Sequence, residues 1–400
     1  MRGHGLANLR TAMSAMPAFA LLTPGRALFG CGTIGQVGKE AAGLGSRALL
    51  VVGGRSVREA GKLDLVLASL REAGVEPTVF NGVEPEPSIE TVDKGREALH
   101  TASCYVVVAV GGGSVLDVGK AIGALAHEPE PTEVYHAGRE IRAPGIPVIA
   151  APTTSGTGAE VTPNSVLTNP GTNVKASIRG GDLMPTVAIV DPEMTLSMPP
   201  EITAYSGLDA LTQAIESYTS TGANAVSDLL AREAVRRIAG SLRRAYADGS
   251  DLSAREDMAL GSLLAGISLA SARLGLVHGL AHPVGAAYHI PHGLACAILL
   301  PHVMRFNLDA AAPKYALLAA DIGLDAADQA ACARALLEWV EGLCRDLGAA
   351  RPLAEFGAAE DDIPGTLPAA LASGSTKHNP RPVKPEDAAA VLGAAIAGPR

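Results

Sequence analysis

The sequence predicts an α/β N-terminal domain with a largely parallel sheet, followed by an all-α C-terminal domain. Up to about residue 200, short apolar runs alternate with helical stretches, which is typical of α/β domains. The runs lack polar alternation, so both faces of each strand should be buried between helices. Beyond Pro200 strand-like runs almost vanish, and long stretches rich in Ala, Leu, Glu and Arg follow. We expect strands at residues 47–52, 78–80, 105–110, 147–151 and 187–190, and helices at residues 225–246 and 254–273.

The chain has 400 residues, which is more than one domain usually contains. We therefore expect an N-terminal extension over residues 1–17, an α/β domain over residues 18–200 and a helical domain over residues 201–400. The extension should be loose or reflect an upstream start codon. A cleft between two such domains is a common place for a ligand.

Composition narrows the class of protein. The formal net charge is −9 and no Lys/Arg-rich run occurs, so we expect no nucleic-acid partner. No apolar stretch reaches the roughly 18 residues of a membrane helix, so we expect no membrane partner either. The five cysteines are scattered without a CxxC pair. This pattern predicts a cytoplasmic, reduced protein with neither a disulfide framework nor a thiolate zinc site.

Two glycine motifs could bind a dinucleotide. The first, Gly30-Cys31-Gly32-Thr33-Ile34-Gly35, has the G-x-G-x-x-G form, but the run before it is short and no acid follows about 20 residues on. We interpret it as a turn into the first helix. The second, Gly111-Gly112-Gly113-Ser114, follows the most strand-like run and opens a helix, where backbone N–H groups can approach a phosphate. Ser114 and Asp117 also have the spacing of a capping box.

A second polar cluster follows the next strand, at residues 152–160. Hydroxyls beside glycines at the carboxyl end of a strand suit pyrophosphate and ribose contacts, although an ordinary turn explains them equally well. Two such clusters on successive strand ends favour a nucleotide site. The chain lacks G-x-x-x-x-G-K-[ST], which disfavours a P-loop nucleoside triphosphatase.

Histidines concentrate in one segment, where His278 and His282 have the spacing that places both on one helix face. Pro283 and Pro291 can break the chain and return His292 toward that face. Imidazoles with one carboxylate suit Zn²⁺ or Fe²⁺. Asp209 is the candidate carboxylate, although Ser206 and Asp209 also fit a capping box. His289 lies off this face and is expected in solvent.

Several segments together resemble the iron-containing (group III) alcohol dehydrogenases, closest to the lactaldehyde/propanediol branch. The resemblance runs from about residue 24 to residue 381. It rests on GGGSVLDVGKAIG (111–123), APTTSGTGAEVT (151–162), VDPEMTLSMPP (190–200), GLDALTQAIESY (207–218), HGLAHPVGAAYHIPHGLACAILLPHVMRFN (278–307) and NPRP (379–382).

The resemblance implies the dehydroquinate synthase-like, iron-alcohol-dehydrogenase fold, with a dinucleotide-binding domain and a divalent metal, Fe²⁺ or Zn²⁺, in the cleft. It implies hydride transfer between NAD(P)(H) and a small alcohol or aldehyde. Asp209, Gln213, His278 and His292 match the metal-ligand positions, and His282 matches a proton-relay position. The positions expected at the cofactor are Gly54, Gly111, Gly112, Gly113, Ser114, Asp117, Thr153, Thr154, Thr162 and Lys175. We expect a homodimer or higher homo-oligomer.

Two positions depart from the family pattern. Gln213 stands where histidine is usual, and an amide oxygen is a weaker ligand, so zinc on three ligands is an alternative to iron. Gly54 followed by Arg55 stands where NAD-preferring members have an acid, which favours NADP(H). Three alternatives remain: a maleylacetate reductase-like enzyme, a dehydroquinate synthase-like lyase, and a nucleotide-binding protein that has lost catalysis through Gln213.

Overall fold

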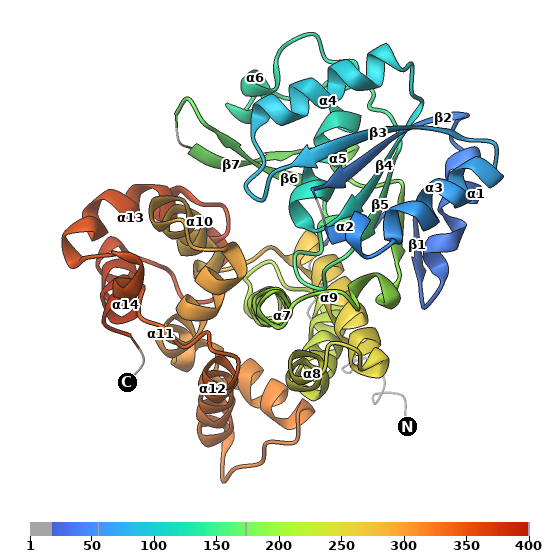
Figure 1. Ribbon diagram of the computed structural model, residues 1–400. Coiled ribbons are helices and arrows are strands. Elements are labelled where there is room, and N and C mark those ends of the chain that lie inside the picture. The colour runs from blue at the N-terminus through green and yellow to red at the C-terminus, as the bar shows by residue number, and fades with distance from the viewer. Residues whose placement is uncertain (1–17, 55, 173, 399–400) are drawn as a thin grey trace, which may run out of the picture.

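A six-stranded parallel sheet forms the core of the N-terminal region. The computed structural model describes residues 18–54, 56–172 and 174–398. The strand order is β1-β8-β5-β4-β2-β3, and every neighbouring pair is parallel (Figure 1). The strands are β1 (Arg26–Phe29), β2 (Arg47–Gly53), β3 (Glu76–Val83), β4 (Val106–Gly111), β5 (Val148–Pro152) and β8 (Val187–Val190). The predicted parallel sheet is therefore confirmed.

Both faces of the central strands are buried, as their unbroken apolar runs predict. Leu49 packs on the side of the sheet covered by α4 and α5, while Leu50 packs on the opposite side with α1 and α3. This alternation follows from the period of two in a strand, and it requires a helix layer on each face. The helices of this region are α1 (Val37–Ala42), α2 (Ser56–Glu59), α3 (Lys62–Glu72), α4 (Ile89–Thr101), α5 (Gly113–Ala124) and α6 (Thr132–His136).

Three strands were not predicted. β1 is only four residues long, and β6 (Asn164–Asn169) and β7 (Val174–Arg179) form a separate antiparallel pair. Polar residues flank the short Val166-Leu167 pair in β6 and alternate with apolar residues in β7, so neither strand carries a long apolar run. β6 packs against α5, and β7 contacts α10 of the helical region. The pair thus forms one wall between the two halves of the molecule.

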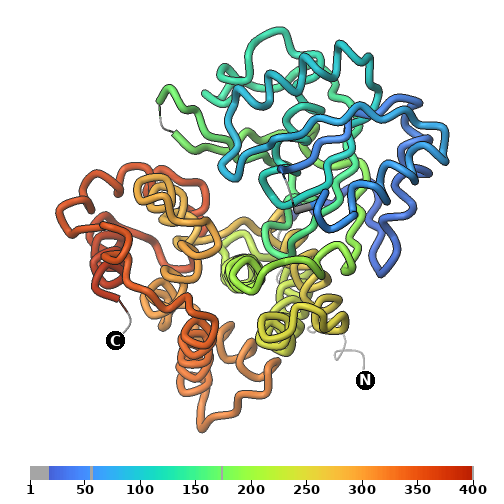
Figure 2. The backbone as a smooth tube through the Cα atoms, in the orientation of Figure 1, coloured from blue at the N-terminus to red at the C-terminus, as the bar shows by residue number. Residues whose placement is uncertain are grey.

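The described residues from Pro200 to Ala397 form α-helices and short 3-10 helices, with no strand among them. α9 packs against β8 through Val190, Ala259 and Leu263, and Figure 2 shows the chain passing from the sheet region into this helical region. The helices are α7 (Pro200–Thr219), α8 (Ala225–Ala247), α9 (Leu252–Ala272), α10 (Leu276–Tyr288), α11 (His292–Asp321), α12 (Gln329–Asp346), α13 (Ile363–Ala372) and α14 (Pro385–Ala397).

α11 has the length and composition of a helix that could cross a membrane, and the bent pair α9–α10 has them when taken as one span. Most of the apolar window of α11 is nevertheless buried inside the protein, among them Leu299, Leu300 and Val303. A core helix of a globular protein meets the same criteria, and this burial identifies α11 as one.

Candidate active site

A cavity of about 660 Å³ lies between the two regions of the chain. Its walls come from α5, β6 and β7 on one side and from α7, α9, α10 and α11 on the other. The cavity is within the size range of small-molecule and cofactor sites. Six predicted cofactor residues line it: Gly113, Ser114, Asp117, Thr154, Thr162 and Lys175. The four predicted metal ligands Asp209, Gln213, His278 and His292 and the predicted proton-relay residue His282 line it as well.

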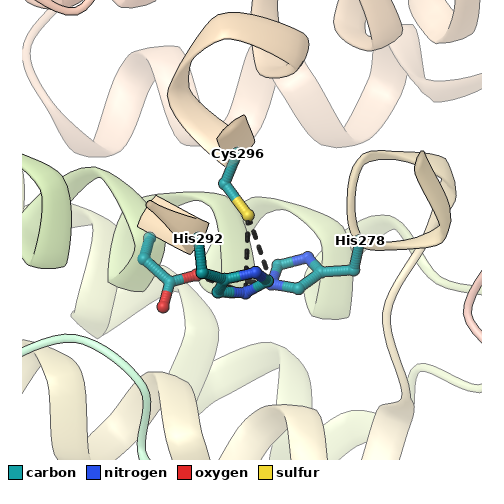
Figure 3. Close-up of side chains that lie close together, drawn as sticks. His278, His292 and Cys296 are labelled. Carbon is teal, nitrogen blue, oxygen red and sulfur yellow. Dashed lines mark hydrogen bonds and ion pairs between the residues drawn. The ribbon is translucent and has the colours of Figure 1, made fainter. Parts of the chain in front are cut away.

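Four groups of metal-binding type converge at the cavity wall, three of them lining the cavity and Cys296 lying behind it. Within the described part of the chain, the ligand atoms of Asp209, His278, His292 and Cys296 all lie within 4.8 Å of one another. Oδ1 of Asp209 is 3.3 Å from Nε2 of His278 and 3.8 Å from Nε2 of His292. Sγ of Cys296 is 3.9 Å from Nε2 of His278 and 3.7 Å from Nε2 of His292 (Figure 3).

α7 presents the acid of this cluster. It begins at Pro200 and runs unbroken to Thr219, so Asp209 lies in its middle and is almost fully buried. The predicted capping box of Ser206 and Asp209 is therefore wrong, because Ser206 donates its hydroxyl to the carbonyl of Ile202 within the helix. An interior helical position leaves the carboxylate free to face the cavity.

A sharp turn between α10 and α11 brings His292 back to His278. His289 ends α10 in the left-handed conformation with φ 53°, and Pro291 precedes the first residue of α11. The ring centroids of His278 and His292 are 5.5 Å apart, which confirms the predicted return of the chain. Pro283, in contrast, lies inside α10 without ending it. His289 is exposed, as expected.

Two buried oxygens in the site lack a hydrogen-bond donor. Oδ1 of Asp209 and Oε1 of Gln213 are both buried, and neither has a partner in hydrogen-bonding geometry among the described residues. Buried acceptors normally find a donor, and leaving one unsatisfied is costly. A cation between these residues would satisfy both atoms, so the residues present fit a divalent metal.

Neighbouring charges shift the pKa values of two acidic groups in the site. Burial raises the pKa of Asp209, but the nearby His292 and His278 outweigh burial and hold that pKa below its usual value. Burial likewise raises the pKa of the Cys296 thiol, and the same two imidazoles more than offset it, so the thiol pKa is lowered. Both groups are thus predisposed to the anionic form that binds a cation.

His282 lies beside the cluster and outside its ligand set. Its ring stacks on His292 with centroids 5.1 Å apart, and its Nδ1 is buried without a hydrogen-bond partner within the described residues. Burial, followed by the positive charge of His292 and Lys175, places the pKa of His282 well below its usual value. His282 therefore presents a neutral imidazole to the cavity.

The glycine loop after β4 forms the opposite end of the cavity. α5 begins at Gly113 with Gly112 as N-cap, and no side chain caps it. The predicted capping box of Ser114 and Asp117 is therefore wrong, because Ser114 donates its hydroxyl to the carbonyl of Pro85. A Cβ added at Gly113 would lie 2.7 Å from Cγ2 of Thr157. Gly113 therefore packs too closely on Thr157 to be replaced by a larger residue without a shift.

The remaining predicted cofactor positions divide into two groups. Asp117 is partly structural, because it accepts the backbone N–H of Val166 and lies 3.1 Å from Nζ of Lys120. Nζ of Lys175 pairs with Glu86 at 2.5 Å at the cavity wall.

The positions outside the cavity lining are Gly54, Gly111, Gly112 and Thr153. Arg55, on which the NADP(H) prediction also rests, lies outside the described residues.

The discounted motif at Gly30–Gly35 is a turn, as interpreted. The N–H of Gly32 donates to Glu193 and that of Ile34 donates to Asp191. These carboxylates occupy the positions that a phosphate would need. The segment enters a 3-10 helix (Thr33–Gln36) with Gly32 at φ 74°.

Sequence reasoning missed two residues of the site. Cys296 was grouped with the scattered cysteines, although it lies four residues after His292 on the same helix face, and the expectation of no thiolate near the metal did not consider it. Glu216 lies seven residues after Asp209, also on one face, and its Oε2 is 2.7 Å from Nδ1 of His278. Helical spacing from the predicted ligands was the signal that could have found both.

A parallel α/β sheet with a glycine loop, joined across one cavity to a helical cluster of metal-binding groups, defines a metal-dependent oxidoreductase that uses a dinucleotide. Two family models match nearly the whole chain: "Iron-containing alcohol dehydrogenase" over residues 24–192 and "Fe-containing alcohol dehydrogenase family, C-terminal" over residues 203–396. The chain belongs to the iron-containing alcohol dehydrogenase family.

Relatives of the chain are similar over almost their full length. The 1,3-propanediol dehydrogenase of Klebsiella pneumoniae is 40% identical over 384 residues, which are 94% of this chain and 98% of that protein. The lactaldehyde reductase of Escherichia coli K12 is 38% identical over 365 residues, 90% and 95% of the two chains. A crystal structure of 1,3-propanediol oxidoreductase superposes with a TM-score of 0.91 at 40% identity, covering 95% of this chain and all of that one.

The family and these relatives show an oxidoreductase that transfers hydride between NAD(P)(H) and an alcohol or aldehyde with a divalent metal. This outcome confirms the predicted resemblance, fold and reaction class. It favours the main prediction over the lyase and the maleylacetate reductase-like alternatives.

Proposed function

We propose that the chain reduces a short aldehyde, or oxidises the corresponding alcohol, at the cluster of Asp209, His278 and His292. The observation that carries this proposal is that these three side chains share one cavity with the glycine loop at Gly113 and Ser114. A substrate in that cavity can reach a metal and a nicotinamide together, which is what hydride transfer requires.

The residues have separate roles in this proposal. Asp209, His278 and His292 hold the metal, with Gln213 at the fourth position that the family pattern assigns. Residues 111–114 bind the pyrophosphate, while Thr154, Thr162 and Lys175 contact the rest of the cofactor. When bound, the metal supplies a Lewis acid and NAD(P)(H) supplies or accepts the hydride.

His282 moves the proton of the reaction in this proposal. It faces the cavity beside His292, and its unpartnered Nδ1 can exchange a proton with the substrate hydroxyl, the cofactor ribose or water. The apolar wall formed by Ile202, Leu269 and Leu274 limits the water around the reacting atoms. A neutral imidazole at this place suits a proton relay.

We further propose that NADP(H) is preferred over NAD(H), since no acid follows β2 at Gly54 and a side-chain atom there would meet nothing within 4 Å. We also propose a cytoplasmic homodimer or higher homo-oligomer, with residues 18–200 and 201–400 as its domains. The negative net charge disfavours nucleic acid. Light scattering during gel filtration measures the subunit count.

The central test joins elemental analysis of the purified protein to an aldehyde panel assayed with NADH and NADPH. We expect about one divalent metal per chain and net consumption of reduced cofactor. Full activity in metal-free protein overturns the role of the metal. Cofactor binding without metal and without turnover supports instead the alternative that catalysis was lost through Gln213.

A further inference from the structure

We propose that the Cys296 thiolate is a protein ligand of the metal, taking the fourth position in place of Gln213. This inference rests on the metal site of the proposed function. It changes the ligand set from one acid, one amide and two imidazoles to one acid, two imidazoles and a thiolate. The site is then a zinc-type site, since thiolate ligands favour Zn²⁺ over Fe²⁺.

The spacing of the four ligand atoms carries the inference. Metal–ligand bonds of about 2.0–2.3 Å in a tetrahedron place the ligand atoms roughly 3.3–3.6 Å apart. Oδ1 of Asp209 and Nε2 of His278 are 3.3 Å apart, and Sγ of Cys296 is 3.7 Å from Nε2 of His292. All four atoms lie within 4.8 Å of one another, so a modest inward shift lets them hold one small cation.

The position of Cys296 also has no other evident purpose. Its side chain is fully buried, and its sulfur contacts both imidazoles on the sides that face Asp209. Cys344 offers a contrast, because it is equally buried in the helical core and its thiol donates to the carbonyl of Ala297. Cys344 is therefore a matched control for a cysteine with a structural role.

Binding through Cys296 needs no redox step. The thiol releases its proton to the solvent as the sulfur–metal bond forms, and the metal keeps its charge. Gln213 then stands beside the ion as a weaker neighbour, since its neutral amide oxygen binds a cation less strongly than a thiolate does. Removing Cys296 should consequently harm metal binding more than removing Gln213.

The test uses metal-free full-length protein titrated with Co²⁺ and with Zn²⁺. We expect one Co²⁺ per chain and a thiolate-to-cobalt charge-transfer band in the near ultraviolet. Cys296→Ser should lose the band and weaken Zn²⁺ binding by at least tenfold, while Cys344→Ser keeps both. Circular dichroism checks that each variant is folded.

Bound Co²⁺ without a thiolate band overturns the inference, and so does a Cys296→Ser variant that keeps the affinity of the wild type. A Gln213→Ala variant that loses more affinity than Cys296→Ser also overturns it, because the amide is then the ligand. These readouts do not depend on turnover. A protein that shows the band but reduces no aldehyde contradicts the proposed function alone.

A separate observation concerns two arginines on the cavity wall. Arg179 ends β7 and Arg273 follows the last residue of α9, and both line the cavity. Neither side chain makes a hydrogen bond or an ion pair with any residue that the structure describes. Both side chains are exposed to solvent. Partial desolvation on the cavity side, and then the like charge of Arg273, lowers the pKa of Arg179.

The backbone at Arg273 is strained. Its φ of 69° and ψ of −179° fall in a region that is almost restricted to glycine. Such conformations are energetically unfavourable and are concentrated at functional sites. This backbone conformation places a second exposed guanidinium on the cavity wall beside Arg179, where one oxyanion could pair with both.

The geometry points to an anionic group on the substrate, so the substrate is a short aldehyde or ketone that carries a carboxylate, sulfonate or phosphonate. Guanidinium groups bind such oxyanions with paired hydrogen bonds. This inference also rests on the proposed function, and it narrows the substrate class of the same site.

The test compares kcat/KM for matched pairs of substrates, such as 4-oxobutanoate with butanal and sulfoacetaldehyde or phosphonoacetaldehyde with propanal. We expect the anionic member to be favoured at least tenfold in the wild type. Arg179→Met and Arg273→Gly should each remove most of this preference and leave neutral aldehydes nearly unaffected. Arg142→Met is the control, because the Arg142 side chain is exposed and lies outside the cavity lining.

Equal kcat/KM for each pair in the wild type overturns the inference. A rise in the KM for NAD(P)H with every aldehyde in Arg179→Met also overturns it, because the arginines then serve the cofactor. If no aldehyde is reduced, the proposed function fails, and calorimetry with succinate still decides whether the arginines bind an anion.

Discussion

Glu216 holds His278 in the orientation that points its Nε2 at Asp209. Its Oε2 lies 2.7 Å from Nδ1 of His278, and its Oε1 accepts the N–H of Val277 at 2.7 Å. The carboxylate thereby fixes which ring nitrogen carries the proton and leaves the other free for an ion. Glu216 on α7 thus holds both the backbone and the imidazole at the start of α10 in place.

Replacing this acid should weaken the metal site without removing a ligand. We expect Glu216→Gln to lower Zn²⁺ affinity about 10–100-fold, because the amide no longer secures the ring tautomer. Competition with a chromophoric chelator measures the affinity. Glu233→Gln, which changes a surface ion pair on α8, should leave it unchanged. Unaltered binding in Glu216→Gln would show that His278 needs no such support.

Loss of a proposed ligand should be more severe. We expect His278→Ala to abolish turnover and to purify with little metal, since the cluster then keeps one imidazole fewer. His100→Ala is the control, because His100 is exposed on α4 and lies outside the cavity lining. Elemental analysis and the NAD(P)H-coupled assay on the same samples check both parts. Activity without metal in His278→Ala contradicts the site.

The cofactor preference can be reversed at Gly54. We expect Gly54→Asp to raise the NADH/NADPH ratio of kcat/KM about tenfold or more, because a carboxylate repels the 2′-phosphate and binds the ribose hydroxyl. The new Cβ meets no atom within 4 Å, so the fold should tolerate it. Gly54→Ala separates the effect of charge from that of size, and equal ratios in both variants would contradict the prediction.

The two glycine motifs should respond differently to a methyl group. Gly113→Ala places a Cβ 2.7 Å from Thr157, so we expect a rise of at least tenfold in the KM for NAD(P)H. Gly35→Ala meets nothing within 4 Å and should be neutral. Initial-rate kinetics at saturating aldehyde check both variants. A strong effect at Gly35 would return the discounted motif to the cofactor site.

Glu160 makes stability depend on pH. Burial raises its pKa to about 7, above the ordinary value of 4.5, so the folded protein binds the proton more tightly than the unfolded chain. The contribution of Glu160 to stability is therefore fully present below about pH 4.5, and this contribution is lost as the pH rises through about 7. The loss is roughly 3 kcal/mol above that pH. Urea unfolding of the metal-free proteins measures this. The free energy of unfolding of Glu160→Gln, taken relative to the wild type, should be higher at pH 8 than at pH 5. An equal difference between the two proteins at both pH values would contradict the prediction.

The sequence predicted the elements whose burial is uniform along the chain. The strand at residues 105–110 was evident because it is an unbroken apolar run whose residues are buried on both faces. The predicted ends of the helix at residues 225–246 agree with those of α8 within one residue. β6 was missed because both of its faces contain polar residues, and β7 was missed because Lys175, Ser177 and Arg179 make one of its faces polar. The capping boxes failed for a related reason: local spacing does not reveal how far a helix extends, and α7 starts six residues before Ser206.

The metal site was predicted as far as its residues belong to known motifs. Asp209, His278 and His292 converge, as the resemblance implies. Cys296 and Glu216 come together with them only because the turn at His289 sets the angle between α10 and α11. Arg179 and Arg273 are 94 positions apart and meet only through contact between β7 and α10, which no local pattern contains.

Because the turn at His289 joins two of the helices that supply the proposed metal ligands, removal of the metal should loosen this part of the protein. His278 and His292 belong to different helices, and Asp209 belongs to a third. A bound cation would therefore cross-link α7, α10 and α11. Stripping it leaves one acid, a thiol and two imidazoles facing one another with nothing between them. Chelated enzyme should accordingly be cut faster by proteases near residue 289, and restoring the ion should protect that corner.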